Sequence, residues 1–228
     1  GFSAILSGNL EFGKGSLLQA LNTASISEDQ FNVTKCLVGL GNIAKTLGDL
    51  EEAERLYREC LVSMREIGHK EGETNPLIHL GLIAYARGDL DEAERFQLES
   101  LVIAREVGDK VGEAGSLINL GNIARIRDDL VGSKKFYLES LSLMRENGNR
   151  RGKATVLQNL GVIAESRGDL DEAESFALES LDIMREIGDR LGVSAILNNL
   201  GIIADSREDF IEAERYYRES LAIDRKIG

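Results

Sequence analysis

Residues 8–16, with the sequence GNLEFGKGS, have the glycine and lysine spacing of a phosphate-binding loop. Such a loop lies between a strand and a helix, where backbone N–H groups and the lysine surround nucleotide phosphates, and a second strand supplies a magnesium-binding aspartate. The remaining sequence predicts no parallel sheet, and the same stretch aligns with a helical repeat. We therefore predict no nucleotide site and no cofactor.

Histidine and cysteine, which could bind a metal or act as nucleophiles, are scarce. Neither His69 nor His79 has Cys, Asp or Glu around it at metal-ligand spacing, and we expect His69 to cap a helix or lie on the surface. Cys36 and Cys60 are too few for a disulfide framework, and we expect them to pack in the core. Because no Ser-His-Asp or Cys-His set occurs, the sequence predicts no catalytic residue, no metal site and no enzymatic activity.

The elements that position these residues recur every 40 residues. A Leu-Gly pair marks the period, at Leu40-Gly41, Leu80-Gly81, Leu120-Gly121, Leu160-Gly161 and Leu200-Gly201. Each repeat contains two segments whose apolar residues follow helical spacing, separated by glycine columns. Asp49 and Glu52 begin the second segment as a capping box, and Gly68 ends it. Pro76 predicts that the first helix of its repeat begins near Thr74 or Asn75.

The period divides the chain into one array. We assign a partial unit to residues 1–28 and full units to residues 29–68, 69–108, 109–148, 149–188 and 189–228. Gly1 aligns with Gly41, and residues 8–10 align with 88–90, which predicts a turn near Gly8. We interpret the chain as a segment of a longer protein, and its uncapped repeat ends would allow oligomers.

The repeated pattern L-x-x-L-G-x-I-A…G-D-L-x-E-A-E-x-x-Y-x-x-x-L resembles the tetratricopeptide repeat. It is similar to the longer, 40-residue variety of kinesin-light-chain-like, Pins-like and bacterial regulator proteins. The landmarks fall on Leu37, Leu40, Gly41, Ala44, Ala53, Tyr57, Leu61 and their equivalents. This resemblance implies an all-α, right-handed superhelical solenoid of antiparallel helix pairs that binds other molecules and does not transform them.

In the resembling family, one arc of the first helices lines a concave groove. The residues on that arc vary in this chain, and we predict that they bind the partner: Asn42, Lys45, His79, Leu82, Tyr85, Ile118, Asn119, Asn122, Arg125, Gln158, Asn159, Val162, Glu165, Asn198, Asn199 and Asp205. A ladder of carboxamides at Asn119, Asn159 and Asn199 could pair with any peptide backbone. Alternatively, these carboxamides bond to neighbouring helices or to water.

These residues favour a scaffold that holds a peptide or helical segment of a partner protein, or of another domain of the same protein. A second hypothesis is a sensor that binds a small molecule and controls an attached ATPase or DNA-binding domain. A deep, closed apolar pocket would favour the sensor, and an open groove would favour the scaffold.

Composition narrows the choice of partner and compartment. The net charge is −12 with 43% apolar residues, which argues against a disordered acidic tail and against a nucleic-acid partner. The longest stretch without a charged residue is 14 residues, whereas a membrane span needs about 20 apolar residues. We therefore expect a cytoplasmic protein without a membrane partner.

Two further surface features have alternative explanations. Leu98, Leu138 and Leu178 form one column, which is either a second interface or, as we favour, packing between second helices. The arginine column that begins at Arg65 lies near helix C-termini, where we expect it to complement the helix dipole.

Overall fold

The structure, a computed structural model, describes residues 2–227, with side chains from residue 10 onward. Within that range the chain is helical and contains no strand, which confirms the all-α class. The helices are α1 (Phe2–Ile26), α2 (Gln30–Thr46), α3 (Leu50–Glu66), α4 (Thr74–Ala86), α5 (Leu90–Val107), α6 (Lys110–Ile126), α7 (Leu130–Glu146), α8 (Arg150–Ser166), α9 (Leu170–Glu186), α10 (Arg190–Ser206) and α11 (Phe210–Ile227). A short 3₁₀ turn at Lys70–Gly72 precedes α4.

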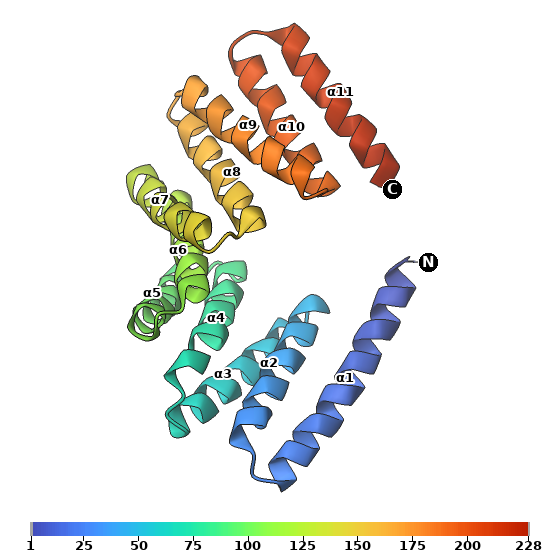
Figure 1. The fold of residues 1–228 in the computed structure, drawn as a ribbon, viewed down its shortest axis with the longest axis vertical. Helices are drawn as coiled ribbons and strands as arrows, with labels where there is room; N and C mark the ends of the chain where they lie inside the picture. Colours follow the sequence, from blue (N-terminus) through green and yellow to red (C-terminus); the bar gives the residue numbers. More distant parts are fainter. Residues whose placement is uncertain (1, 228) are drawn as a thin grey trace. The chain divides into compact units, whose positions relative to one another are not determined.

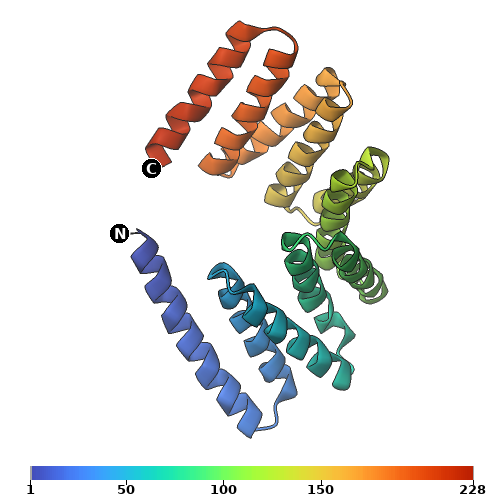
Figure 2. The ribbon, with the colours of Figure 1, turned by 180° about the vertical axis from the view of Figure 1, so that it is seen from behind.

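The chain divides into two compact units, one up to Ser116 and one from Leu117 onward. In the first unit α2 pairs with α3 and α4 pairs with α5, and in the second α8 pairs with α9 and α10 pairs with α11 (Figures 1 and 2). Each unit has its own apolar core, around Leu37 and Leu77 in the first and around Leu157 and Leu197 in the second. These leucines belong to one column of the repeat, so the 40-residue period positions the core.

The Asp residues before the second helices cap them as predicted, but the reciprocal half of the capping box does not form. Asp49 Oδ1 accepts a hydrogen bond from the Glu52 backbone N–H at 3.0 Å. The Asp49 N–H instead donates to the Ala44 carbonyl at 2.9 Å, closing the preceding helix. The Glu52 carboxylate pairs with Arg55 at 2.7 Å. The short turn thus closes one helix and caps the next. The Asp49 N–H is already used, so it cannot donate to the Glu52 carboxylate.

The boundaries around Pro76 and Gly68 confirm the sequence interpretation. Helix α4 begins at Thr74, which places Pro76 in its first turn. His69 caps the preceding turn, since its Nδ1 accepts from the Gly72 N–H at 2.9 Å. Gly68 ends its helix with φ of 68°, a left-handed conformation that glycine adopts without strain. Asp128 and Glu208 adopt similar angles of 62° and 63° at turns where other repeats have glycine.

The predicted turn near Gly8 is wrong. Helix α1 runs without interruption from Phe2 to Ile26, so residues 8–16 are helical and form no phosphate-binding loop. In the other repeats, a turn at the equivalent position lies between two helices that bury a face against each other. Here the backbone continues through this position as one helix, so its hydrogen bonds are made within α1.

Cys36 and Cys60 are both buried, as expected for core residues. The Cys60 thiol donates to the Thr34 carbonyl at 3.6 Å, and burial raises its pKa to about 11. None of the described helices is both long and apolar enough to cross a membrane.

The arginine column makes contacts that the sequence interpretation missed. Arg65 pairs with Glu99 of α5 and, at 3.1 Å, with Glu73, so it links successive second helices. In the second unit Arg185 of α9 pairs with Glu219 of α11 at 2.8 Å. The arginine column therefore joins successive second helices by ion pairs, in addition to complementing the helix dipole.

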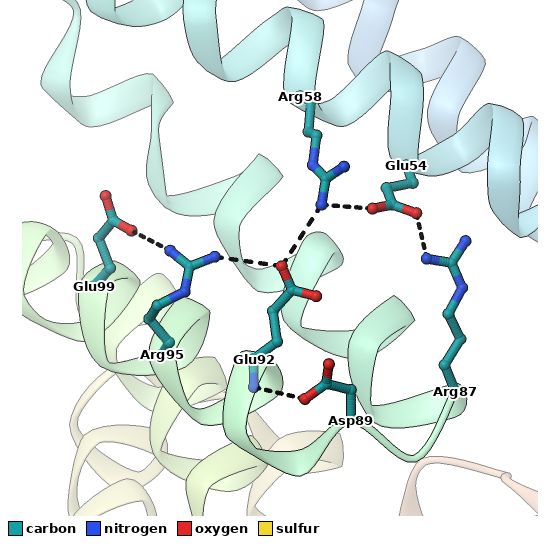
Figure 3. A network of polar contacts seen from close by, with 7 residues as sticks. All are labelled: Glu54, Arg58, Arg87, Asp89, Glu92, Arg95 and Glu99. Carbon is teal, nitrogen blue, oxygen red and sulfur yellow. Dashed lines mark hydrogen bonds and ion pairs between the residues drawn. The ribbon is translucent and has the colours of Figure 1, made fainter.

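Figure 3 shows a second set of ion pairs between α3, α4 and α5. The Glu54 carboxylate contacts Arg58, at 2.6 Å, and Arg87, while Arg58 also reaches Glu92 at 3.6 Å. The Glu54 side chain is only 14% exposed, so these contacts close the space between the three helices.

The leucine column is more exposed than predicted. Leu98, Leu138 and Leu178 have exposed fractions of 44%, 44% and 41%. More than half of each leucine is therefore covered and the remainder is exposed, so both interpretations of this column stay predictions. The equivalent residue on α3 is Arg58, which forms an ion pair with Glu54. The position therefore lies at the edge of the contact between helices, where it is partly exposed to solvent.

Candidate partner-binding surface

A tyrosine of the second helix packs directly onto the glycine of the first helix. A Cβ atom at Gly41 would lie 2.8 Å from Tyr57 Cε1, and at Gly121 it would lie 2.5 Å from Tyr137 Cε1. Both tyrosines are fully buried, and their hydroxyls donate to Asn42 Oδ1 at 2.7 Å and to Asn122 Oδ1 at 2.6 Å. Two of the predicted partner-binding asparagines thus have a hydrogen bond to the neighbouring helix, as in the alternative explanation.

In the first unit, Lys45 and His79 join this packing. The His79 ring stacks on Tyr57 with a centroid distance of 4.8 Å, and Lys45 Nζ lies 3.2 Å from His79 Nδ1. Burial, and then the Lys45 charge, lower the pKa of His79 to about 4, so the ring is neutral and accepts from the ammonium group. Burial also lowers the pKa of Lys45. Leu82 and Tyr85, on α4, are both half-buried.

In the second unit, the predicted residues lie on α6, α8 and α10. Those that are half-buried are Ile118, Asn119, Asn122, Gln158, Asn159, Val162, Glu165 and Asn199, whereas Arg125, Asn198 and Asp205 are exposed. Ile118 also packs against the core of this unit.

The carboxamides of the second unit fall into two groups. Asn119 already has a partner within the chain. In contrast, the side chains of Asn159 and Asn199 make no hydrogen bond to any residue that the structure describes. Both remain in contact with solvent, since no buried side-chain polar atom in the described part lacks a partner. Their donors and acceptors are therefore available to a ligand.

The fourth full repeat lacks the packed tyrosine, because Ala177 occupies its position. A narrow notch of about 10 Å³ opens there, and its walls include Gln158, Val162, Glu165 and Asn199. The structure thus brings four predicted residues together around Gly161. Sequence reasoning missed Ala177, although its departure from the column Tyr57, Gln97, Tyr137 and Tyr217 is visible in the sequence.

Across residues 2–227, with side chains from residue 10, no group of three His, Cys, Asp or Glu side chains could hold a metal ion. The surface described above offers amide, apolar and charged groups for recognition.

Comparison with known families decides what kind of array this is. Models of the tetratricopeptide repeat match residues 33–67, 73–146, 113–186 and 152–226. The chain belongs to the tetratricopeptide repeat family. Members of this family are generally non-enzymatic scaffolds, and in that general sense the chain is a protein-interaction scaffold. Among curated proteins, a sequence comparison finds no match to the chain.

Solved structures share the fold at low sequence identity. BtubC (BKLC) from P. vanneervenii is 24% identical with a TM-score of 0.83, over 96% of this chain and 92% of that one. A Rap protein complexed with Competence and Sporulation Factor is 11% identical with a TM-score of 0.73, over 99% of this chain and 73% of that one. A signal-transduction ATPase from Pyrococcus horikoshii with a tetratricopeptide repeat sensor is 17% identical with a TM-score of 0.78. The match covers 94% of this chain and only 34% of that protein.

Proposed function

We propose that the variable face of α6, α8 and α10 binds an extended segment of a partner protein. The observation that carries this proposal is the pair of half-buried carboxamides at Asn159 and Asn199, which have no partner among the described residues. A carboxamide presents both a donor and an acceptor, which is what the backbone of an extended peptide requires. Asparagine is also a poor helix former, so helix stability does not explain its presence in mid-helix at both positions.

The notch beside Ala177 supports a point of side-chain recognition on the same face. Its floor is apolar and its rim carries the Gln158 and Asn199 carboxamides and the Glu165 carboxylate. The notch has room for about one water-sized sphere, so the group recognised there would be no larger than a methyl group. The Rap protein of similar fold, complexed with Competence and Sporulation Factor, is a precedent for ligand binding by this architecture.

Charge favours a particular orientation of the bound segment. Within the second unit, Arg125 is followed one and two repeats later by Glu165 and Asp205. A basic residue of the partner would be attracted to the two carboxylates, and an acidic residue to Arg125. Electrostatic complementarity of this kind contributes more to specificity and association rate than to affinity.

The experiment selects peptides from a random-sequence display library on the full chain and measures their affinity by calorimetry. In the double variant Asn159→Ala/Asn199→Ala, we expect affinity to fall about tenfold or more, corresponding to about 1.4 kcal/mol, with an unchanged denaturation midpoint. The control is Asn122→Ala, which removes the acceptor of Tyr137 and should lower the midpoint while affecting affinity less than twofold. Loss of stability without loss of affinity in the double variant would overturn the proposal.

A further inference from the structure

An apolar cavity of about 180 Å³ lies between α1, α2 and α3, in the first unit. Its inner wall is formed by leucine side chains, including Leu21, Leu37, Leu40 and Leu56. At its mouth are Leu18 of α1 and Leu47 at the end of α2, each 48% exposed. The cavity is separate from the face proposed above for partner binding, which belongs to the second unit.

The next repeat shows why this space is open. Forty residues further on, the equivalent of Leu56 is Phe96, which is 6% exposed and belongs to the apolar core of this unit. The same column carries Phe136, Phe176 and Tyr216, so Leu56 is the one residue of the five without a ring. The cavity therefore lies where the other repeats place an aromatic side chain.

The mouth differs from the next repeat as well. The equivalents of Leu18 and Leu47 are Arg58 and Arg87, which close the opening through Glu54 (Figure 3). With leucines in place of these two arginines, that ionic closure is absent and part of the entrance is apolar. Leucine is the usual residue at the position of Leu18, whereas Leu47 departs from a column that is otherwise arginine. Two departures, Leu56 in the interior and Leu47 at the mouth, therefore distinguish this opening from the other repeats.

The charged groups at the rim favour a neutral ligand. Arg55 pairs with Glu52 at 2.7 Å and with Glu59 at 2.8 Å. Both carboxylates are on α3, so the charge of Arg55 is balanced within its own helix. Arg55 and then Lys14 lower the pKa of Glu52, so this carboxylate stays ionised. With three carboxylates and two cations around the opening, counting Asp49, the rim offers no site for an anionic group without nearby repulsion.

We propose that this cavity binds a small, neutral, apolar molecule containing one six-membered ring. An apolar cavity of about 150 Å³ is sufficient to hold benzene, and the leucine side chains supply the apolar wall that such a ring requires. The ligand would replace the ring that Leu56 lacks and would contact the leucine walls. A bound molecule would couple the packing of α1 to the α2–α3 pair, which is the kind of input that the sensor hypothesis requires.

The test uses toluene as the probe and the full chain with ¹³C-labelled leucine methyl groups. We expect toluene to shift the methyl resonances of Leu21, Leu37 and Leu40 in a saturable manner. The variant Leu56→Phe, which installs the ring of the other repeats, should weaken binding more than tenfold. Its matched control is Leu98→Phe, which makes the same change at an exposed position of the same unit and should leave binding within twofold.

A second variant guards against misfolding of Leu56→Phe. Leu18→Arg changes a half-exposed residue at the mouth to its counterpart in the next repeat and should weaken toluene binding at least threefold. A parallel titration with N-acetyl-phenylalanine amide tests whether the ring belongs to a partner's side chain. Binding of that compound more than tenfold tighter than toluene, shifts that do not saturate, or toluene binding that is equal in Leu56→Phe and Leu98→Phe would overturn the proposal.

Discussion

Alanine substitution of two equivalent glycines should have opposite effects on stability. Gly121 and Gly161 occupy the same column, on α6 and α8 of the second unit. A Cβ at Gly121 would lie 2.5 Å from Tyr137 Cε1, whereas at Gly161 the nearest atom is the Ala173 carbonyl oxygen at 3.4 Å. The difference arises from one position of the second helix, which is Tyr137 in one repeat and Ala177 in the next.

The magnitudes follow from two opposing effects. Alanine is more favourable than glycine inside a helix by about 1 kcal/mol, and at Gly161 little opposes this gain. At Gly121 the fully buried Tyr137 ring must move, which strains its 2.6 Å bond to Asn122. Overpacking costs about 1–3 kcal/mol and a lost hydrogen bond about 1 kcal/mol. We therefore expect Gly161→Ala to stabilise by up to about 1 kcal/mol and Gly121→Ala to destabilise by about 1–3 kcal/mol.

Urea denaturation followed by circular dichroism would measure both variants. Because repeat arrays need not unfold in one step, the comparison uses the transition that contains the second unit, identified by hydrogen exchange of α6 and α8 amides. In a Tyr137→Ala background, which imitates the fourth full repeat, Gly121→Ala should become neutral or stabilising. Equal shifts for Gly121→Ala and Gly161→Ala, or an unchanged penalty without Tyr137, would refute the packing argument.

Three other perturbations have expected outcomes of known sign. Glu208→Gly should raise the free energy of unfolding by about 1 kcal/mol, and with it the urea midpoint, because glycine adopts a φ of 63° without strain. Glu208→Ala should give no such gain. The depressed pKa of His79, about 4 against 6.5 for a free side chain, means that stability is full above pH 6.5 and falls as pH is lowered toward 4. Urea midpoints across this range should show a smaller fall in His79→Asn, which carries the asparagine of later repeats and removes the partner of Lys45. Glu54→Gln should destabilise by about 1 kcal/mol at low ionic strength and by less in about 1 M salt, while Glu51→Gln, an exposed neighbour, should change little in thermal melts at either salt.

Much of the fold followed from the sequence because local signals agreed with the period. The start of α4 beside Pro76, the cap at His69 and the glycine at the Gly68 turn are each set by a few neighbouring residues. The uninterrupted α1 did not follow, since the turn expected at Gly8 depends on packing partners and the local residues resemble those of a true turn.

The candidate site was harder to predict because it depends on which residues lie opposite one another. Asn42 and Asn159 are both on the variable face of a first helix, and the sequence alone gives them the same role. Asn42 lies in the column that the buried tyrosine reaches, and it accepts from the Tyr57 hydroxyl. Asn159 lies three positions earlier in its repeat and makes no hydrogen bond to any described residue. Only the packing of one helix against the next shows which carboxamide already has a hydrogen-bond partner within the chain.

The cavity at Leu56 and the notch at Ala177 have the same origin, which is a smaller residue in a column that holds larger ones elsewhere. Leu56 and Ala177 each replace a larger side chain that fills a gap between helices in other repeats, and each leaves a cavity lined by its neighbours. A single such change could be neutral variation. At Leu56, however, a second residue at the mouth, Leu47, also departs from its column, in which the four other full repeats have arginine. Two departures, one that enlarges the interior and one that removes a charge from the mouth, are expected if the opening itself is the feature that the sequence specifies.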